Sequence, residues 1–333
     1  SAKAVCLQSH NALVAVHPVT GKTLWSRNDV AKLCHLYNDN QYLYVVEIHK
    51  DTNTPGRARI FRVDDGVELR KIRDFSGYYA SRVKMFGRSL LFTGTNEKGQ
   101  KVLRLYDVLK GRDIWTQKLT ATAKVLQSEA KHLTGIVETN GKVTLIDLKK
   151  GEKTVTAQMD PEHLKDVETV RLLKDRHYFY VVCDGTDNKA VAINQRMTNL
   201  MPNTGMRWVS VNGYIYCFHN ETGKRNWFYR PKDYEDKKHP ALPHMMVLES
   251  FEDMPSVVLT TRFTQRVGFN NRYMISTQIL NKKTGKLMFE EKTSNSSTQQ
   301  FHTIRVDPRA NRVDLISYDR KLSMVIGKEK AKK

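Results

Sequence analysis

The sequence has few of the residues that hold small proteins together by covalent or metal links. Its 333 residues include only four cysteines, which lie far apart and form no C-x-x-C pair: Cys6, Cys34, Cys183 and Cys217. A chain of this length buries enough apolar surface to fold without disulfides or metals. Each cysteine falls in an apolar, strand-like run, so we expect structural thiols, and a single disulfide between distant strands stays open.

Long hydrophobic runs are also missing. The longest apolar stretches, such as residues 178–183, stop at about six residues, whereas a membrane-spanning helix needs about 20. We therefore expect no transmembrane segment, and the 40% hydrophobic and 27% charged residues indicate a globular protein. The chain starts at Ser1 directly before a strand-like run, so we expect it to be a processed or excised piece of a larger protein.

Acidic residues are in deficit: 35 Asp and Glu stand against 55 Lys and Arg, a formal net charge of +20. Such a balance favours acidic partners but does not determine a fold. The basic residues are spread along the chain among acidic ones and show no nucleic-acid-binding motif. Their one local concentration follows Ile326: Lys328, Lys330, Lys332 and Lys333. Contact with an acidic protein surface or with nucleic acid stays an alternative.

A repeated hairpin motif is the most informative feature present. Six segments read as a strand, a polar turn ending in Gly, and a second strand. The turn glycines are Gly21, Gly66, Gly111, Gly151, Gly223 and Gly285, and the first three gaps between them are 45, 45 and 40 residues. A glycine at the end of such a turn allows a positive φ, so the hairpin can close tightly.

An aromatic residue recurs four positions after the turn glycine. This position holds Trp25, Arg70, Trp115, Val155, Trp227 and Phe289, and thus three of the four tryptophans of the chain. We expect an aromatic side chain here to wedge its strand against the neighbouring sheet and to bury a large apolar area.

The period predicts an all-β fold. Further alternating runs precede each hairpin, so each period holds about four strands, which is typical of β-propeller blades. We predict one β-propeller of about seven blades, alternatively eight, over residues 1–327, closed by the N- and C-terminal strands and followed by a basic tail, 328–333. One short helix is expected near residues 160–169, with Pro161 at its first position.

Three hairpins, at Leu13–Trp25, Leu103–Trp115 and Tyr216–Trp227, resemble the PQQ-like repeat, whose consensus runs roughly lyAlDaeTGkvlW. The sequence is thus similar to the quinoprotein alcohol dehydrogenase-like propellers. With the segments Ser250–Leu259 and Arg309–Lys321 included, it is more closely similar to propeller modules of large planctomycete proteins. It departs from the consensus at the acid before the turn, which is His17 and His219 in two copies. The resemblance implies a propeller fold and an extracytoplasmic location.

The resemblance also raises the possibility of a quinone cofactor. Catalytic members use an Asp base, a Ca²⁺ ion and a Trp beneath the PQQ, and many add a disulfide between adjacent cysteines. Here no cysteines are adjacent, no D-x-D-x-D cluster occurs, and only Trp208 lies outside the wedge position. We therefore assign no catalytic or metal-binding residue and predict a non-catalytic scaffold, with a PQQ-dependent oxidoreductase as the alternative.

One insertion is the expected contact surface. Residues 231–243 are polar and bounded by prolines, and exposed loops on rigid scaffolds often bind partners. The predicted interaction residues are Tyr234, Lys237, Lys238 and His239. The pair His239 and His244 could suggest a metal site, but loop histidines without a further ligand are usually solvated. We expect the partners to be other proteins or other domains of the parent chain.

Overall fold

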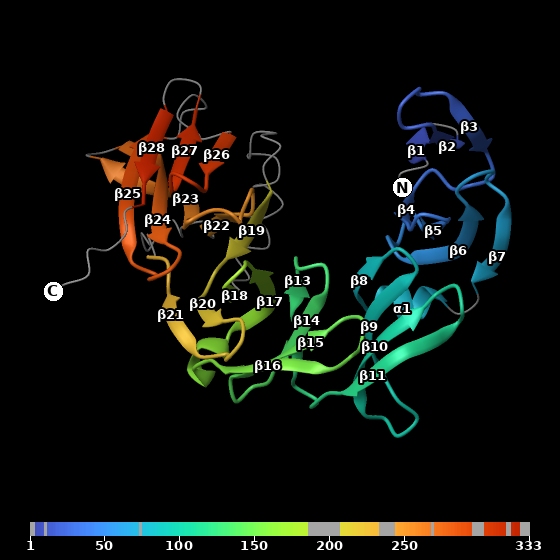
Figure 1. Cartoon of the computed structure of the whole chain (residues 1–333), viewed down its shortest axis with the longest axis horizontal. Coiled ribbons are helices and arrows are strands. Elements are labelled where there is room, and N and C mark those ends of the chain that lie inside the picture. Colours follow the sequence, from blue (N-terminus) through green and yellow to red (C-terminus); the bar gives the residue numbers. More distant parts are fainter. Residues whose placement is uncertain are drawn as a thin grey trace. The chain divides into compact units, whose positions relative to one another are not determined.

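The computed structural model describes residues 4–9, 12–72, 75–185, 207–232, 244–267, 270–294, 303–317 and 321–326. The chain divides into two compact units. Unit 1 comprises residues 1–123 and the turn 148–152, and unit 2 comprises residues 124–147 and 153–333. Each unit is a succession of sheets, drawn along the chain in Figure 1.

In its described residues, unit 1 contains three sheets of consecutive antiparallel strands. Sheet 1 is β1 (Val5–Ser9), β2 (Ala12–Val16) and β3 (Thr23–Arg27). Sheet 2 is β4 (Cys34–Asn38), β5 (Tyr42–Ile48), β6 (Pro55–Arg62) and β7 (Glu68–Ile72). Sheet 3 is β8 (Arg82–Phe86), β9 (Ser89–Thr95), β10 (Lys101–Asp107) and β11 (Arg112–Lys118).

Unit 2 contains four sheets in its described residues. Sheet 4 is β12 (Lys124–Val125), β14 (Leu133–Val137), β15 (Lys142–Asp147) and β16 (Lys153–Gln158). Sheet 5 is β13 (Gln127–Ser128), which pairs in parallel with β17 (Val167–Lys174), then β18 (Tyr178–Gly185), β20 (Ile215–His219) and β21 (Arg225–Tyr229). Sheet 6 is β19 (Trp208–Val211), β22 (His244–Val247), β23 (Ser256–Val267), β24 (Asn270–Asn281) and β25 (Leu287–Ser294). Sheet 7 is β26 (Thr303–Asp307), β27 (Arg312–Ile316) and β28 (Lys321–Val325).

These small meandering sheets confirm the predicted all-β, propeller-type fold. The number of blades is not confirmed. Closure of residues 1–327 into a single ring also stays a prediction, and the tail 328–333 lies outside the described residues.

Within the described residues, two short helices interrupt the strands. The 3₁₀ helix η1 (Pro161–Leu164) lies where the proline predicted a helix, although the Asp160 side chain makes no capping hydrogen bond. Helix α1 (Phe75–Ala80) was not predicted, because FSGYYA has no helical periodicity and contains a glycine. Phe75 and Tyr79 of α1 are buried against sheets 2 and 3, so packing rather than helix propensity places it.

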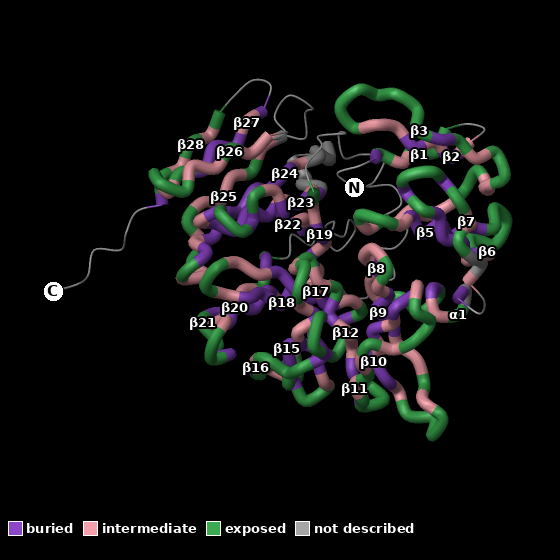
Figure 2. Tube along the Cα trace, turned by 45° about the vertical axis from the view of Figure 1, so that its right-hand side comes forward, coloured by how far each residue is buried: buried purple, intermediate pink, exposed green. Residues whose placement is uncertain are grey.

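The apolar cores lie on the central strands of the sheets, whereas the turns are exposed (Figure 2). One cluster packs sheet 1 against sheet 2, and others pack sheet 4 against sheet 5 and sheet 5 against sheet 6. Cys183 and Cys217 are buried in β18 and β20, Cys6 and Cys34 are half-buried, and all four are free thiols.

Candidate functional site

Every repeat hairpin closes with its glycine at a φ of 66° to 74°. His17, Asp107 and Asn281 each lie four positions before their turn glycine, and their side chains accept hydrogen bonds from the turn amides. Asp107 Oδ1 accepts hydrogen bonds from the amides of Leu109 (3.0 Å) and Lys110 (2.9 Å), and His17 Nδ1 lies 3.3 Å from the amides of Val19 and Thr20. In the first hairpin an imidazole nitrogen therefore replaces the consensus carboxylate as the acceptor, so the turn is capped although the acid is absent.

Each repeat hairpin contains a β-bulge at the same place. We call the second strand of each hairpin the outer strand, since β3, β7, β11, β16, β21 and β25 all lie at a sheet edge. In every one the register shifts by one residue at the third position after the turn glycine. In β3, for example, Ala15 pairs with Trp25 and Val16 pairs with Thr23, which leaves Leu24 unpaired. A bulge re-aims the side chains beside it, and here the next residue is the wedge position.

The three wedge tryptophans all dock on the next repeat glycine along the chain. The indole Nε1 of Trp25 donates to Val63 O (2.7 Å), that of Trp115 to Leu148 O (2.9 Å) and that of Trp227 to Lys282 O (3.0 Å). Each indole ring lies against a glycine three residues further on: Gly66, Gly151 and Gly285. A Cβ there would lie 2.5 to 2.6 Å from a ring carbon, so only glycine leaves room for the indole.

Where the wedge residue is small, the backbone itself makes the contact. At Gly223 an added Cβ would collide with the carbonyl of Thr156, directly after the wedge residue Val155. Phe289 packs instead against the core shared by sheets 6 and 7. The three wedge tryptophans thus join their outer strands to the next repeat turn.

The bulge residues form a recurring apolar feature of the outer strands. They are Leu24, Leu69, Ile114, Thr154, Asn226 and Met288. The four apolar ones are 39% to 47% exposed. Thr154 and Asn226 instead hydrogen-bond backbone carbonyls, those of Leu145 and Lys283. Four of six outer strands therefore present a large apolar side chain at the same position.

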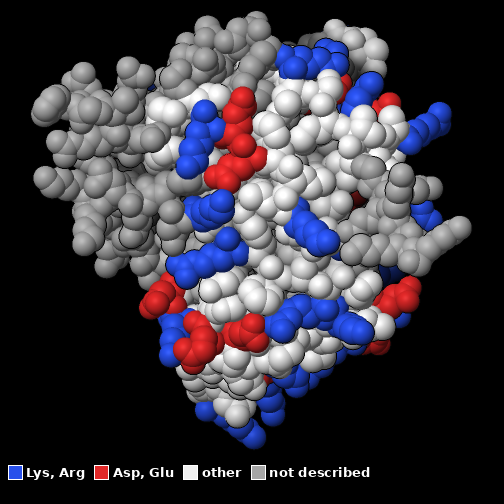
Figure 3. Space-filling view, turned by 90° about the vertical axis from the view of Figure 1, so that its left-hand side faces the viewer, with Lys and Arg blue, Asp and Glu red and all other residues white. Residues whose placement is uncertain are grey.

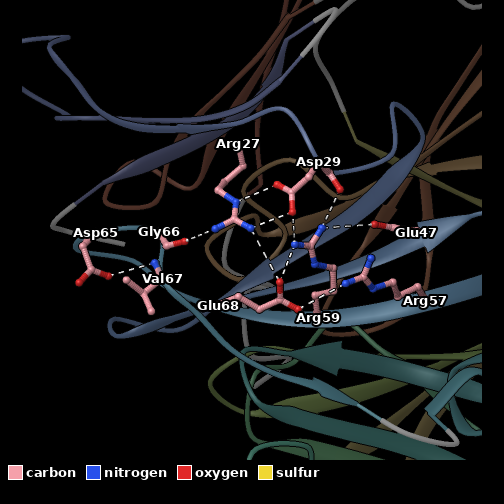
Figure 4. A network of polar contacts seen from close by, with 9 residues as sticks. All are labelled: Arg27, Asp29, Glu47, Arg57, Arg59, Asp65, Gly66, Val67 and Glu68. Atoms are coloured by element: carbon pink, nitrogen blue, oxygen red, sulfur yellow. Dashed lines mark hydrogen bonds and ion pairs between the residues drawn. The ribbon is translucent and has the colours of Figure 1, made fainter.

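A buried arginine connects sheets 1 and 2 (Figure 4). Arg59 of β6 is 1% exposed, and its guanidinium binds the carboxylates of Asp29 (2.5 Å) and Glu68 (2.6 Å). Glu47 lies 3.8 Å away, and Arg27 binds Asp29 from the other side at 2.8 Å. Hydrogen bonds from Arg27 and Arg59 hold the pKa of Asp29 well below its usual range, and Arg59 likewise lowers the pKa of Glu68. The network ties the linker after β3 to sheet 2.

A second buried cation, Lys282, interrupts the pattern in unit 2. The residue three positions before the repeat glycine is apolar and buried in three other copies, as Val63, Val108 and Leu148. Here the Lys282 side chain is 7% exposed and its Nζ lies 3.0 Å from Asp175 Oδ2. Burial lowers the pKa of Lys282, and Asp175 opposes this shift. Nζ also donates to the carbonyl of Phe251 and lies 3.9 Å from the centre of its ring.

Phe251 belongs to the floor of a hollow between sheets 5 and 6. We call it the acidic hollow; its volume is about 230 Å³ and it is lined by Glu129, Ala130, Leu173, Lys174, Arg207, Leu248, Ser250, Phe251, Glu252 and Asp253. Leu173, Leu248 and Phe251 are 2% to 6% exposed and form its apolar base. Arg207 lies 3.9 Å from Glu129 at the rim, and its amide donates to Glu249 (3.1 Å). Sequence reasoning missed this site, because its residues come from separate repeats.

A larger cleft of about 430 Å³ lies in unit 1. It is lined by the turn between β9 and β10 and by residues of β10 and β11, among them Arg104 and Asp113, whose side chains pair at 2.9 Å. Arg104 also stacks over the rings of Tyr78 and Phe92, so packing holds this guanidinium in place.

The predicted interaction residues Tyr234, Lys237, Lys238 and His239 lie outside the described residues. His244, expected to be solvated, instead begins β22 and is 6% exposed. In the part of the chain that the structure describes, no three His, Cys, Asp or Glu side chains are grouped to hold a metal ion, so we derive no reaction through Ca²⁺ or a quinone. None of the described helices is long and apolar enough to span a membrane.

Comparison with known proteins finds similarity to solved structures. No family model matches the chain, and no curated protein does. Among solved structures, BamB from Moraxella catarrhalis is similar at 12% identity, with a TM-score of 0.38 over 96% of this chain and 80% of BamB. The computationally designed protein Ika8 is similar at 11% identity, with a TM-score of 0.33 over 98% of this chain and 97% of Ika8.

Proposed function

We propose that the chain is a non-catalytic interaction module of a larger protein and that its outer strands contact protein partners. One observation carries the proposal: exposed apolar residues recur at the bulge position. Single exposed apolar residues are ordinary on any surface. Leu24, Leu69 and Ile114 are different because one repeated bulge presents all of them, on three consecutive sheets of unit 1.

The bulge makes these residues available to a partner. Beside Leu24 and Ile114, the wedge residues Trp25 and Trp115 donate hydrogen bonds to the next repeat turn, while the bulge residues themselves stay 41% and 47% exposed. The wedge contacts also keep the sheets in place, which lowers the entropy that binding would cost.

Site-specific photo-crosslinking in the full-length parent protein tests this function. A benzophenone amino acid replaces Leu24, Leu69 or Ile114 in turn. Thr154 and Asn226 occupy the same bulge in other copies and serve as matched controls. We expect the same partner protein in adducts from the three apolar positions and little from the controls, with recovery of that partner lost in the triple variant L24N/L69N/I114N. Equal adducts at all five positions, or no protein adduct, would contradict the proposal.

A further inference from the structure

One side of the acidic hollow is negatively charged, in contrast to the chain as a whole. The segment 248–255, which forms one side of the hollow, carries Glu249, Glu252 and Asp253 and no basic residue, although the whole chain has a net charge of +20. Glu252 and Asp253 are exposed at the rim and have no ion-pair partner within 4 Å among the described residues. Two basic residues also line the hollow: Arg207 lies 3.9 Å from Glu129, and Lys174 has no ion pair within 4 Å among the described residues.

The base of the hollow is apolar and small. Leu173, Leu248 and the Phe251 ring provide a surface for an aliphatic chain. A volume of about 230 Å³ is below the roughly 300–1,000 Å³ of pockets for complete small molecules. The hollow therefore fits a single side chain better than a cofactor.

The buried Lys282 side chain holds the loop at one side of the hollow in place. Burying an ammonium group where other copies have Val or Leu is unfavourable unless the charge is paired. The Lys282 ammonium is paired with the Asp175 carboxylate. It also donates a hydrogen bond to the Phe251 carbonyl, which fixes the loop that carries the rim carboxylates. Trp227 fixes the Lys282 backbone in turn. A preorganised loop loses little entropy when a ligand binds.

We propose that the acidic hollow binds one lysine or arginine side chain presented by a partner protein. Its aliphatic stem lies on Leu173, Leu248 and Phe251, and its charged head lies between the carboxylates of Glu252 and Asp253. This site goes beyond the outer-strand contact, since it lies in unit 2 and uses none of the bulge residues of unit 1.

The test uses isolated amino-acid probes and the whole chain. Protein labelled at its leucine methyl groups is titrated with Nα-acetyl-lysine methylamide and Nα-acetyl-arginine methylamide, and the NMR signals of Leu173 and Leu248 are followed. We expect saturable shifts with both cationic probes. Nα,Nε-diacetyl-lysine methylamide, which keeps the stem but has no charge, and the corresponding glutamate probe should shift these signals little.

The matched variants separate charge from fold. E252Q/D253N should weaken binding of the lysine probe by about fivefold, as expected for the loss of two partly exposed ion pairs. D51N/E221Q removes the same charge from exposed turns elsewhere and should leave the affinity unchanged. Equal binding of the uncharged probe, preference for the glutamate probe, no saturable shift, or an unaltered affinity in E252Q/D253N with a native spectrum would each overturn the proposal. None of these outcomes depends on the crosslinking result at the outer strands.

Discussion

At the residue scale, equivalent glycines of the repeat have different tasks. Gly21 and Gly285 share a positive φ, 67° and 69°, but their surroundings differ. An added Cβ at Gly21 meets nothing within 4 Å, whereas at Gly285 it would lie 2.6 Å from the Trp227 ring. Gly21 therefore serves only the turn, and Gly285 also makes room for the docked indole.

We expect G21A and G285A to separate these two roles. G21A should lower the free energy of unfolding by about 1 kcal/mol, because an alanine is strained at positive φ. G285A should cost about 3 kcal/mol or more, since displacement of the indole adds to the same strain. Urea denaturation measures both. Similar losses in the two variants would show that the indole contact contributes little.

The buried Lys282–Asp175 pair leads to a second residue-scale prediction. D175N keeps an acceptor for the amides of His177 and Tyr178 but leaves the buried ammonium without its counter-ion. We expect it to lower the free energy of unfolding by about 3–5 kcal/mol. The double variant D175N/K282M should recover most of that loss, because no uncompensated charge remains. A double variant as unstable as D175N would mean that the charge is not the cause.

At the scale of elements, the repeat made the hairpins and their order predictable, because the glycine and aromatic spacing reflects local turn and packing geometry. The runs before each hairpin likewise became β5, β9, β14, β18 and β23. Helix α1 could not be predicted, since tertiary packing of Phe75 and Tyr79 stabilises it. Nor could the acidic hollow or the burial of Lys282, because a lysine in a turn motif looks solvated until the neighbouring repeat is placed.

The Arg59 network predicts acid sensitivity at the junction of sheets 1 and 2. Arginine lowers the folded-state pKa of Asp29 and Glu68, so their contribution to stability is complete above their unfolded pKa values, near 4, and is lost as the pH falls below them. Wild type should therefore lose stability from about pH 5 to pH 3 more steeply than E68Q, which cannot titrate at this position. Thermal melts across that range test this, and parallel pH profiles would contradict it.

At the scale of the whole molecule, the net charge does not form a single binding surface in the view of Figure 3. On that face, Lys and Arg side chains lie singly or beside Asp and Glu. Several of the basic residues of the chain are neutralised locally, as Arg27, Arg59 and Arg104 are. On this face the charge therefore favours weak, general attraction more than recognition of one polyanion.

This charge distribution predicts that the chain binds nucleic acid only through non-specific electrostatic attraction. We expect binding to duplex DNA to show no sequence preference and to be largely lost between about 50 and 200 mM salt. Fluorescence anisotropy with two unrelated duplexes at several salt concentrations measures it. A marked preference for one duplex, or binding that persists at high salt, would point to a specific nucleic-acid site.

The repeated bulges have a further consequence for how the protein behaves in a crowded solution. A sheet edge with a long, regular row of free amide and carbonyl groups can add strands from other molecules and grow into an aggregate. Six outer strands would offer six such templates. A bulge in every one breaks the row close to the turn and twists the edge away from a flat partner. We therefore expect the bulges to protect these outer strands from edge-to-edge association into fibres.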